Sequence, residues 1–272
     1  MANDIRLNDG RHMPVIGLGT WPMDDAEAER AVATALELGY RHIDTAVRYG
    51  NERGVGRGLA ASGLPREEVF VTTKLNGPHQ GDGPAIDGLR ESLDRLGLEY
   101  VDLVLIHWPL PQRDVYVQTW RTFERTQEMG LARSIGVSNF KPAHLERLAR
   151  ETSVVPAVNQ VQLNPYVTRQ DHRAYHDEHG IVTSSYSPIG KGGDLLRDPV
   201  IGEVAASHAR SAAQVILRWH LQLGLVPVPK SSREERMREN LDVFSFELTP
   251  DEMRRISSLD KGGGVDSDSA GH

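Results

Sequence analysis

Residues 39–56 read GYRHIDTAVRYGNERGVG and place a carboxylate at the end of a short apolar stretch. The residues before Asp44 are typical of a buried β-strand, whereas aspartate itself is disfavoured in strands. A tyrosine, Tyr49, follows five residues later in a glycine-flanked turn. An aspartate after a strand usually caps a turn, so the stretch leaves open whether Asp44 has only this local role or shares a site with Tyr49.

Short apolar runs of the same kind recur along the chain and alternate with longer amphipathic stretches. Eight of them are candidate strands: residues 15–20, 41–46, 69–75, 101–108, 133–139, 157–163, 181–187 and 225–229. Helical spacing of apolar residues marks the stretches 25–39, 82–97, 114–130 and 141–150 between them. Eight strand–helix repeats in 272 residues predict an α/β fold of the (β/α)₈ TIM-barrel type. A doubly wound sheet is the alternative, but no G-x-G-x-x-G pattern follows the first strand.

The two ends of the chain differ from this pattern. Residues 1–14 predict a hairpin around Asn8-Asp9-Gly10 that plugs the bottom of the barrel. Residues 261–272 are rich in glycine and serine, which indicates a flexible tail or a loop over one face. No linker divides the sequence, so we expect residues 1–272 to form a single domain.

Composition excludes several classes of function. A net charge of −7 argues against a nucleic-acid surface, which needs a basic face. The absence of cysteine excludes disulfides, thiolate catalysis and cysteine-ligated zinc. No signal peptide and no apolar run of membrane-spanning length is visible, so a cytoplasmic protein is expected. His172 and His176 have a metal-like spacing but lack the glutamate of H-E-x-x-H, and no metal site is expected.

Polar residues collect at the carboxyl ends of the candidate strands, where barrels carry their active sites. These residues are Asp44, Lys74, His107, Ser138, Asn139, Gln160, Ser185, Tyr186, Ser187, Lys230 and Ser231. Each has an ordinary structural role when taken alone: Asp44 as a cap, His107 as a core histidine and Lys74 as a surface charge. Their convergence on one rim favours a shared site, which Tyr49 can also reach from its loop.

The sequence resembles the aldo-keto reductases over almost its whole length. The motifs that carry the resemblance are GYRHIDTAVRYGNERGVG, LGLEYVDLVLIHWP, IGVSNF, PAVNQVQLNP, YSPIGKG and VPKSSREERMREN, in family order. Within the family, the compact segment after HWP and the ending LDVFSFELTPDEMRRISSLD are most similar to bacterial members that reduce diketogluconates and other small carbonyls.

The resemblance implies NADPH-dependent reduction of aldehydes and ketones by hydride transfer, with Tyr49 as general acid. The Lys74 ammonium would lower the pKa of the Tyr49 phenol, and Asp44 would keep Lys74 protonated. His107 would donate a hydrogen bond to the substrate oxygen.

The same resemblance implies a set of cofactor-binding residues. They are Thr20, Ser138, Asn139, Gln160, Tyr186, Ser187, Ile189, Gly190, Lys230, Ser231, Ser232, Arg233, Arg236, Glu239 and Asn240. Arginine matches the geometry of phosphate groups, so the basic cluster that contains Arg233 and Arg236 favours a 2′-phosphate. NADPH or NADP⁺ is therefore preferred, with weaker use of NADH possible.

The resemblance also suggests a substrate pocket with Trp21, Val47 and Trp108 beside Tyr49 and His107. The substrate would be a small keto-sugar, a dicarbonyl or an aldehyde, and the protein a monomer. Asn76, Gln162 and Asn164 depart from the family pattern. Asn76 suggests a wider or more polar pocket.

Two other functions stay open at this point. A nonenzymatic module of the same fold would bind the nucleotide to regulate a partner. A barrel aldolase or lyase would instead use Lys74 to form a Schiff base.

Overall fold

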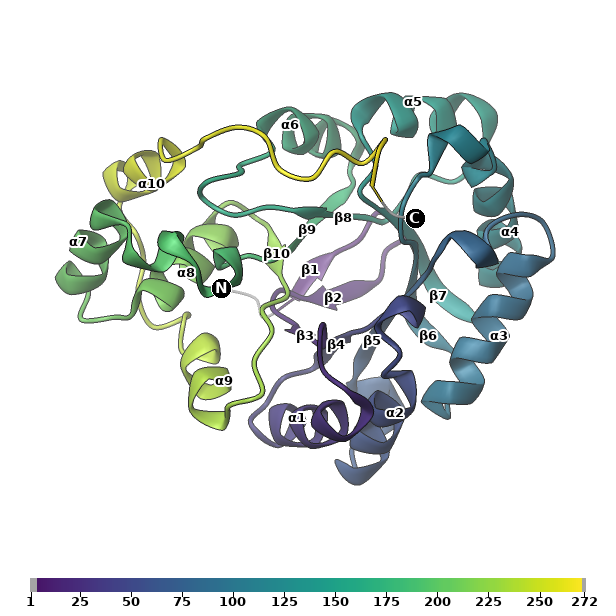
Figure 1. Cartoon of the computed structure of the whole chain (residues 1–272), viewed down its shortest axis with the longest axis horizontal. Coiled ribbons are helices and arrows are strands. Elements are labelled where there is room, and N and C mark those ends of the chain that lie inside the picture. Colours follow the sequence, from purple (N-terminus) through teal and green to yellow (C-terminus); the bar gives the residue numbers. More distant parts are fainter. Residues whose placement is uncertain (1–3, 271–272) are drawn as a thin grey trace.

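The computed structural model describes residues 4–270 and contains an eight-stranded parallel sheet curled into a barrel (Figure 1). Its strands pair in chain order and are β3 (Leu18–Gly19), β4 (His42–Asp44), β5 (Phe70–Leu75), β6 (Val101–Ile106), β7 (Ala132–Ser138), β8 (Val158–Gln162), β9 (Val182–Tyr186) and β10 (Val226–Pro227). Every strand coincides with one of the eight candidate runs. The predicted (β/α)₈ fold is confirmed.

The barrel closes between its first and last strands. The backbone N–H groups of Gly17 and Gly19 donate to the carbonyl oxygens of Pro227 and Pro229, each at 3.1 Å. Gly19 also forms a parallel bridge with Lys230. This seam brings Thr20 to the same rim as the residues that follow β10.

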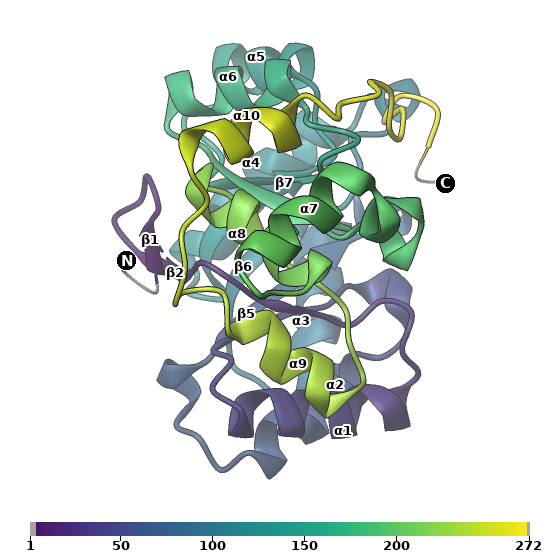
Figure 2. The same cartoon turned by 90° about the vertical axis from the view of Figure 1, so that its left-hand side faces the viewer.

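Helices surround the barrel on its outer face (Figures 1 and 2). They are α1 (Asp25–Glu37), α2 (Glu52–Ala61), α3 (Pro84–Leu96), α4 (Tyr116–Glu128), α5 (Pro142–Glu151), α6 (Gln170–His179), α7 (Pro199–Ser207), α8 (Ala212–Gln222), α9 (Glu234–Leu241) and α10 (Pro250–Ser257). The helical patterns in the sequence correspond to α1, α3, α4 and α5.

Helix α2 is hidden in the sequence by its glycines, which disfavour helices. A Cβ built on Gly54 would overlap the backbone of Asp25, and one built on Gly56 would overlap that of Leu96. The glycines therefore allow α2 to lie unusually close to α1 and to the end of α3. Close packing of the three helices outweighs the cost in local propensity.

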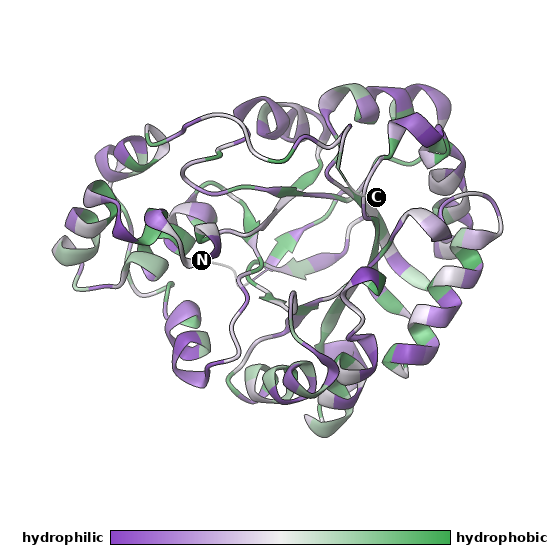
Figure 3. Ribbon diagram, in the orientation of Figure 1, coloured by the Kyte–Doolittle hydropathy of each residue, from purple (hydrophilic) through white to green (hydrophobic). Residues whose placement is uncertain are grey.

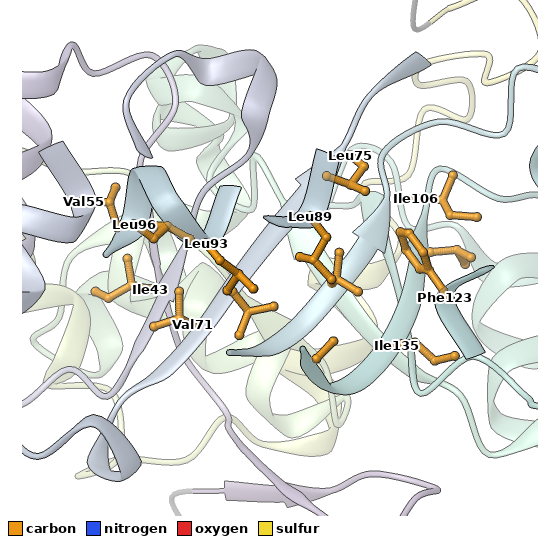
Figure 4. Close-up of a cluster of buried hydrophobic side chains, with 14 of the residues drawn as sticks. Ile43, Val55, Val71, Leu75, Leu89, Leu93, Leu96, Ile106, Phe123 and Ile135 are labelled. Carbon is orange, nitrogen blue, oxygen red and sulfur yellow. The ribbon is translucent and has the colours of Figure 1, made fainter. Parts of the chain in front are cut away.

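Side chains alternate across the barrel wall. Val71, Leu75 and Ile106 point outward and pack against the apolar faces of the helices (Figure 4). Their neighbours Phe70, Leu103, Leu105, Val158, Val182 and Val226 form a second cluster with Leu7 and Met13 of the N-terminal hairpin. In Figure 3, hydrophobic residues (green) are frequent along the barrel strands, whereas hydrophilic residues (purple) are frequent on the surrounding helices.

The hairpin consists of β1 (Asp4–Arg6) and β2 (His12–Pro14), which pair antiparallel. It lies at the far end of the barrel in the view of Figure 1. Because Leu7 and Met13 are buried among inward-facing strand residues, the hairpin fills the amino end of the barrel, as predicted. Residues 1–3 of the expected 1–14 segment lie outside the described residues.

The segment after α10 crosses the opposite rim (yellow in Figure 1). The N–H of Val265 donates to Gln162 Oε1 at 2.8 Å, and the Arg169 guanidinium donates to the Val265 carbonyl at 2.8 Å. Lys141 Nζ pairs with Asp266 at 2.7 Å and with Asp268 at 2.5 Å. We call residues 261–270 the C-terminal strap; residues 271–272 of the predicted tail lie outside the described range.

Within residues 4–270, no helix combines the length and the apolar character needed to cross a membrane. The same residues contain no group of three histidine, cysteine or acidic side chains placed to hold a metal ion. Both ring nitrogens of His176 are instead bonded, to Asn159 at 2.9 Å and Thr183 at 2.8 Å.

We predict that buried His176 makes the fold sensitive to acid. Burial lowers its pKa to about 3, with a smaller contribution from the neighbouring histidines. Below about pH 6.5, His176 is therefore protonated in the unfolded chain but stays neutral in the folded chain. Because the unfolded state binds the extra proton, the free energy of unfolding falls as the pH drops. Between about pH 7 and pH 5 this group should remove about 2 kcal/mol of unfolding free energy.

Urea unfolding of wild type and His176→Gln at both pH values checks this. From pH 7 to pH 5, the wild type should lose about 2 kcal/mol more unfolding free energy than His176→Gln, whatever the difference between the two proteins at pH 7. His12→Gln, which removes an exposed histidine, is the control. Parallel pH profiles for wild type and His176→Gln would contradict the prediction.

Candidate active site

A cleft of about 1040 Å³ opens at the carboxyl end of the barrel. Seventeen of the residues expected from the sequence line it: Thr20, Trp21, Asp44, Tyr49, His107, Trp108, Ser138, Asn139, Gln160, Tyr186, Ser187, Ile189, Lys230, Ser231, Arg236, Glu239 and Asn240. The strand ends and the loops after them therefore converge on one concave surface.

A buried ion pair lies at the floor of the cleft. Lys74 Nζ donates to Asp44 Oδ1 at 2.6 Å, and the two side chains are only 1% and 3% exposed. Nζ also donates to the carbonyl oxygen of Thr45 at 2.9 Å. Burial lowers the pKa of Lys74 and is the largest single effect, but the charges of Asp44 and Tyr49 and the hydrogen bonds to them together raise it by more, so the net shift is upward. Lys74 is therefore a fixed ammonium.

Tyr49 lies directly above this ammonium. Its hydroxyl is 3.3 Å from Lys74 Nζ, and its ring packs against Trp21 and, edge-on, against His107. Burial raises the pKa of the phenol, and Lys74 opposes that rise without cancelling it. The expectation of a net lowering of the Tyr49 pKa is therefore wrong. The Lys74 ammonium lies beside the phenol as expected, but desolvation raises the pKa by more than the ammonium lowers it.

His107 contributes a neutral imidazole. Burial, together with the charges of Lys74 and Arg48, lowers its pKa well below the ordinary value. Its Nδ1 has no hydrogen-bond partner among residues 4–270. A neutral ring carries one N–H donor and one acceptor, so His107 can donate a hydrogen bond without bringing a charge.

Four polar side chains beside the floor are connected by hydrogen bonds. Tyr186 Oη donates to Asn139 Oδ1 at 2.8 Å, and Asn139 Nδ2 donates to the His107 carbonyl at 3.0 Å. Ser138 Oγ donates to the Gln160 carbonyl at 2.8 Å, while Gln160 Nε2 donates to Asp44 Oδ2 at 2.8 Å. This network orients amide and hydroxyl groups along one wall of the cleft and occupies the second oxygen of Asp44.

The other end of the cleft is rich in donors for an anion. Lys230 and Arg236 line it on the approach to α9 and on α9 itself. The start of α8 adds Ala212 and Ala213, whose N–H groups stay open because Ser211 and Gln214 satisfy each other in a capping box. Open N–H groups at a helix start favour negative charge.

Six expected residues are not part of the cleft lining, among them Ser185, which is buried in β9. Lys74 lies beneath it, and Val47 packs against the core cluster between barrel and helices. Ser232 and Arg233 are exposed near the start of α9, and Gly190 lies in the loop after β9. A role of these last three toward a bound cofactor stays a prediction.

The cleft also contains residues that sequence reasoning missed. Arg48, Lys191, Ala212, Ala213, Val265 and Ala270 are the main examples. Helix capping around Ser211 could have indicated the α8 residues, since S-x-x-Q is a recognisable start signal. Nothing in the sequence distinguishes Arg48 from other loop arginines.

The departures from the family pattern have local explanations. Asn76 Oδ1 bonds His79 at 2.9 Å in a turn and does not line the cleft, so it gives no support to a wider pocket. Gln162 holds the C-terminal strap through Val265. Asn164 donates to the Ser187 carbonyl at 3.3 Å and supports the loop after β9.

The rim of this (β/α)₈ barrel therefore combines a buried lysine–aspartate pair, a tyrosine above it and a neutral histidine. Residues 15–261 match the model of the Aldo/keto reductase family, and the chain belongs to that family. An aldo-keto reductase of Mycolicibacterium vanbaalenii is 52% identical and covers 94% of this chain and 91% of its own.

Two further relatives cover nearly the whole chain. The 2,5-diketo-D-gluconic acid reductase B of a Corynebacterium species is 47% identical over 98% of this chain and 97% of its own. The crystal structure of a Gox0644 mutant in complex with NADPH is 43% identical and superposes with a TM-score of 0.94 over 98% of both chains. The resemblance inferred from the sequence motifs is confirmed.

We predict that Asp44→Asn destabilises the fold, because it leaves the Lys74 ammonium buried without its counter-charge. Removing one partner of a buried pair typically costs about 3–5 kcal/mol. The double variant Asp44→Asn/Lys74→Met should recover most of that loss. Urea unfolding measures both, with Asp251→Asn at an exposed pair as control. A single variant as stable as wild type would contradict the prediction.

Proposed function

We propose that this protein reduces aldehydes and ketones to alcohols with NADPH, and that Tyr49 is the proton donor. The observation that carries the proposal is the Tyr49 hydroxyl at the cleft floor, 3.3 Å from a lysine ammonium that is itself fixed by Asp44. An alcohol product requires a proton on the former carbonyl oxygen, and Tyr49 is a buried donor with a cation behind it.

The residues of the cleft fit a nicotinamide dinucleotide phosphate. Arg236, Lys230 and the open N–H groups of α8 suit its phosphates, whereas Ser138, Asn139 and Gln160 offer the amide and hydroxyl groups that a carboxamide needs. The Tyr186 ring would stack on the nicotinamide. When bound, the cofactor supplies hydride to the carbonyl carbon. The Gox0644 mutant in complex with NADPH supports this choice.

Tyr49 acts as a proton donor that stays protonated at neutral pH. Because burial raises the pKa of the phenol, the proton leaves only when negative charge develops on the nearby carbonyl oxygen. The Lys74 ammonium stabilises the phenolate as it forms, and Asp44 keeps that ammonium charged. This arrangement stabilises the transition state more than the ground state, as catalysis requires.

His107 orients the carbonyl and stabilises its developing charge. Its low pKa keeps the ring neutral, so the N–H donor does not compete with Tyr49 for the role of acid. Edge-on packing against Tyr49, with ring centroids 5.9 Å apart, holds the two donors side by side. Two donors that converge on one oxygen define an oxyanion-type site.

The substrate is a small keto-sugar, dicarbonyl or aldehyde held between aromatic walls. Trp21 and Trp108 both line the cleft, and Trp108 stacks on His107. The name of the Corynebacterium relative, a 2,5-diketo-D-gluconic acid reductase, supports a small polyoxygenated carbonyl.

The two alternative functions are less compatible with the site. A Schiff base needs a neutral amine, whereas Asp44 raises the pKa of Lys74. A regulatory nucleotide-binding module would need no buried ion pair beneath a tyrosine, and such a pair is costly to bury.

We predict that Tyr49→Phe lowers kcat for carbonyl reduction by at least about a thousandfold, because it removes the proton donor. NADPH binding, followed by fluorescence titration, should change by less than about threefold, a difference of under 1 kcal/mol. Tyr175→Phe, outside the cleft on α6, is the matched control. Near-normal turnover of Tyr49→Phe would refute the assignment.

We predict that Arg236→Ala weakens NADPH binding by about tenfold or more while NADH affinity changes little, since its guanidinium is assigned to the 2′-phosphate. Arg238 lies on the same helix, is exposed and pairs with Glu234, so Arg238→Ala is the control. Dissociation constants for both nucleotides decide the matter. Equal losses for NADPH and NADH would remove the 2′-phosphate assignment.

A further inference from the structure

A cation lies at the substrate end of the cleft, next to the proposed proton donor. Arg48 belongs to the short 3₁₀ turn η1 (Val47–Tyr49), is exposed and lines the cleft with Trp21, Tyr49 and Trp108. Its charge contributes to the lowered pKa of His107, so the guanidinium is close enough to act on that ring. Arg48 is the cleft-lining cation adjacent in sequence to Tyr49.

Arg48 has no carboxylate partner among residues 4–270. Two other cations near the rim are paired: Lys230 with Glu27 at 3.1 Å, and Lys141 with Asp266. Arg236 and Lys191 line the cleft without a carboxylate partner among the described residues, but Arg236 lies on α9 and Lys191 in the loop after β9. Of the acidic residues that line the cleft, Asp44 is bonded to Lys74 and Glu239 lies on α9, at the opposite end. The protein therefore leaves one arginine at the substrate end without a counter-charge.

The turn fixes Arg48 relative to the catalytic groups. Tyr49 N–H donates to the Ala46 carbonyl at 3.0 Å, and Gly50 N–H donates to the Val47 carbonyl at 3.2 Å. Adjacent Cα atoms are about 3.8 Å apart, so one small molecule can reach Tyr49 and Arg48 together. A guanidinium binds a carboxylate well, because its fork matches the carboxylate geometry.

We propose that Arg48 binds a carboxylate of the substrate and makes this site selective for small aldehyde or keto acids over neutral carbonyls. This assignment rests on the proposed reductase function and names the substrate class for the same site. The carboxylate contacts Arg48 while the carbonyl oxygen, a few carbon atoms away, accepts hydrogen bonds from Tyr49 and His107.

A matched pair of substrates tests the selectivity with NADPH as cofactor. Wild type should reduce 4-oxobutanoate with a kcat/KM at least about tenfold above that of its methyl ester, since one charge-assisted contact distinguishes them. Arg48→Gln should lose that preference, mainly through a higher KM for the acid. Arg48→Lys should retain part of it, because the ammonium keeps the charge but not the fork.

Arg53→Gln is the control for net charge. Arg53 lies five residues further on, is exposed on α2 and does not line the cleft. This variant should keep the acid-to-ester ratio of wild type. A wild-type enzyme that shows no preference for the acid would overturn the proposal. So would an Arg48→Gln variant whose losses for acid and ester are equal.

A binding measurement separates this inference from the proposed reaction. Succinate, which has no reducible carbonyl, should quench the fluorescence of the cleft tryptophans in the NADP⁺-loaded protein and do so more weakly in Arg48→Gln. If neither carbonyl consumes NADPH but succinate binding depends on Arg48, the proposed reaction fails while the carboxylate site stands. Succinate binding that is the same in wild type and Arg48→Gln overturns the site.

Discussion

The ion pair between Asp44 and Lys74 is the constraint on which the site depends. Burying two charges is expensive and is tolerated only when their geometry and remaining hydrogen bonds are satisfied. The barrel meets this condition because β4 and β5 pair in parallel with Asp44 opposite Thr72, so Lys74 reaches the carboxylate from two residues further along. The Thr45 carbonyl and Gln160 complete the set of partners. Tyr49, His107 and the amide wall are then arranged around a fixed charge.

Much of this arrangement could be predicted from the sequence. The strands are continuous apolar runs because both of their faces are buried, and polar residues at their carboxyl ends stand out for that reason. Asp44, Lys74 and His107 were identifiable in this way, and the family motifs added Tyr49. Helix α2 could not be identified in this way, because Gly54 is needed for a close contact with α1 and no local sequence pattern indicates that contact.

Properties that depend on the three-dimensional surroundings of a residue could not be predicted from the sequence. A charged partner for Tyr49 could be inferred, but not that desolvation outweighs it. Arg48 is an ordinary exposed arginine until the turn of η1 directs it into the cleft. The glycine-rich ending gave no sign that Gln162 and Lys141 would hold it across the rim. In each case the missing information is a distant neighbour and not a residue type.

The seam between β3 and the segment after β10 has a consequence for how the cleft is completed. Thr20 and Trp21 follow one side of the seam, and Lys230 and Ser231 belong to the other. The parts of the cleft wall on the two sides of the seam therefore come from opposite ends of the barrel's chain. These two parts of the wall meet only where the barrel closes, whereas the Asp44–Lys74 pair lies between the neighbouring strands β4 and β5. Opening of the seam would therefore separate Thr20 from Lys230 without touching the ion pair, so this part of the cleft depends on closure of the whole barrel.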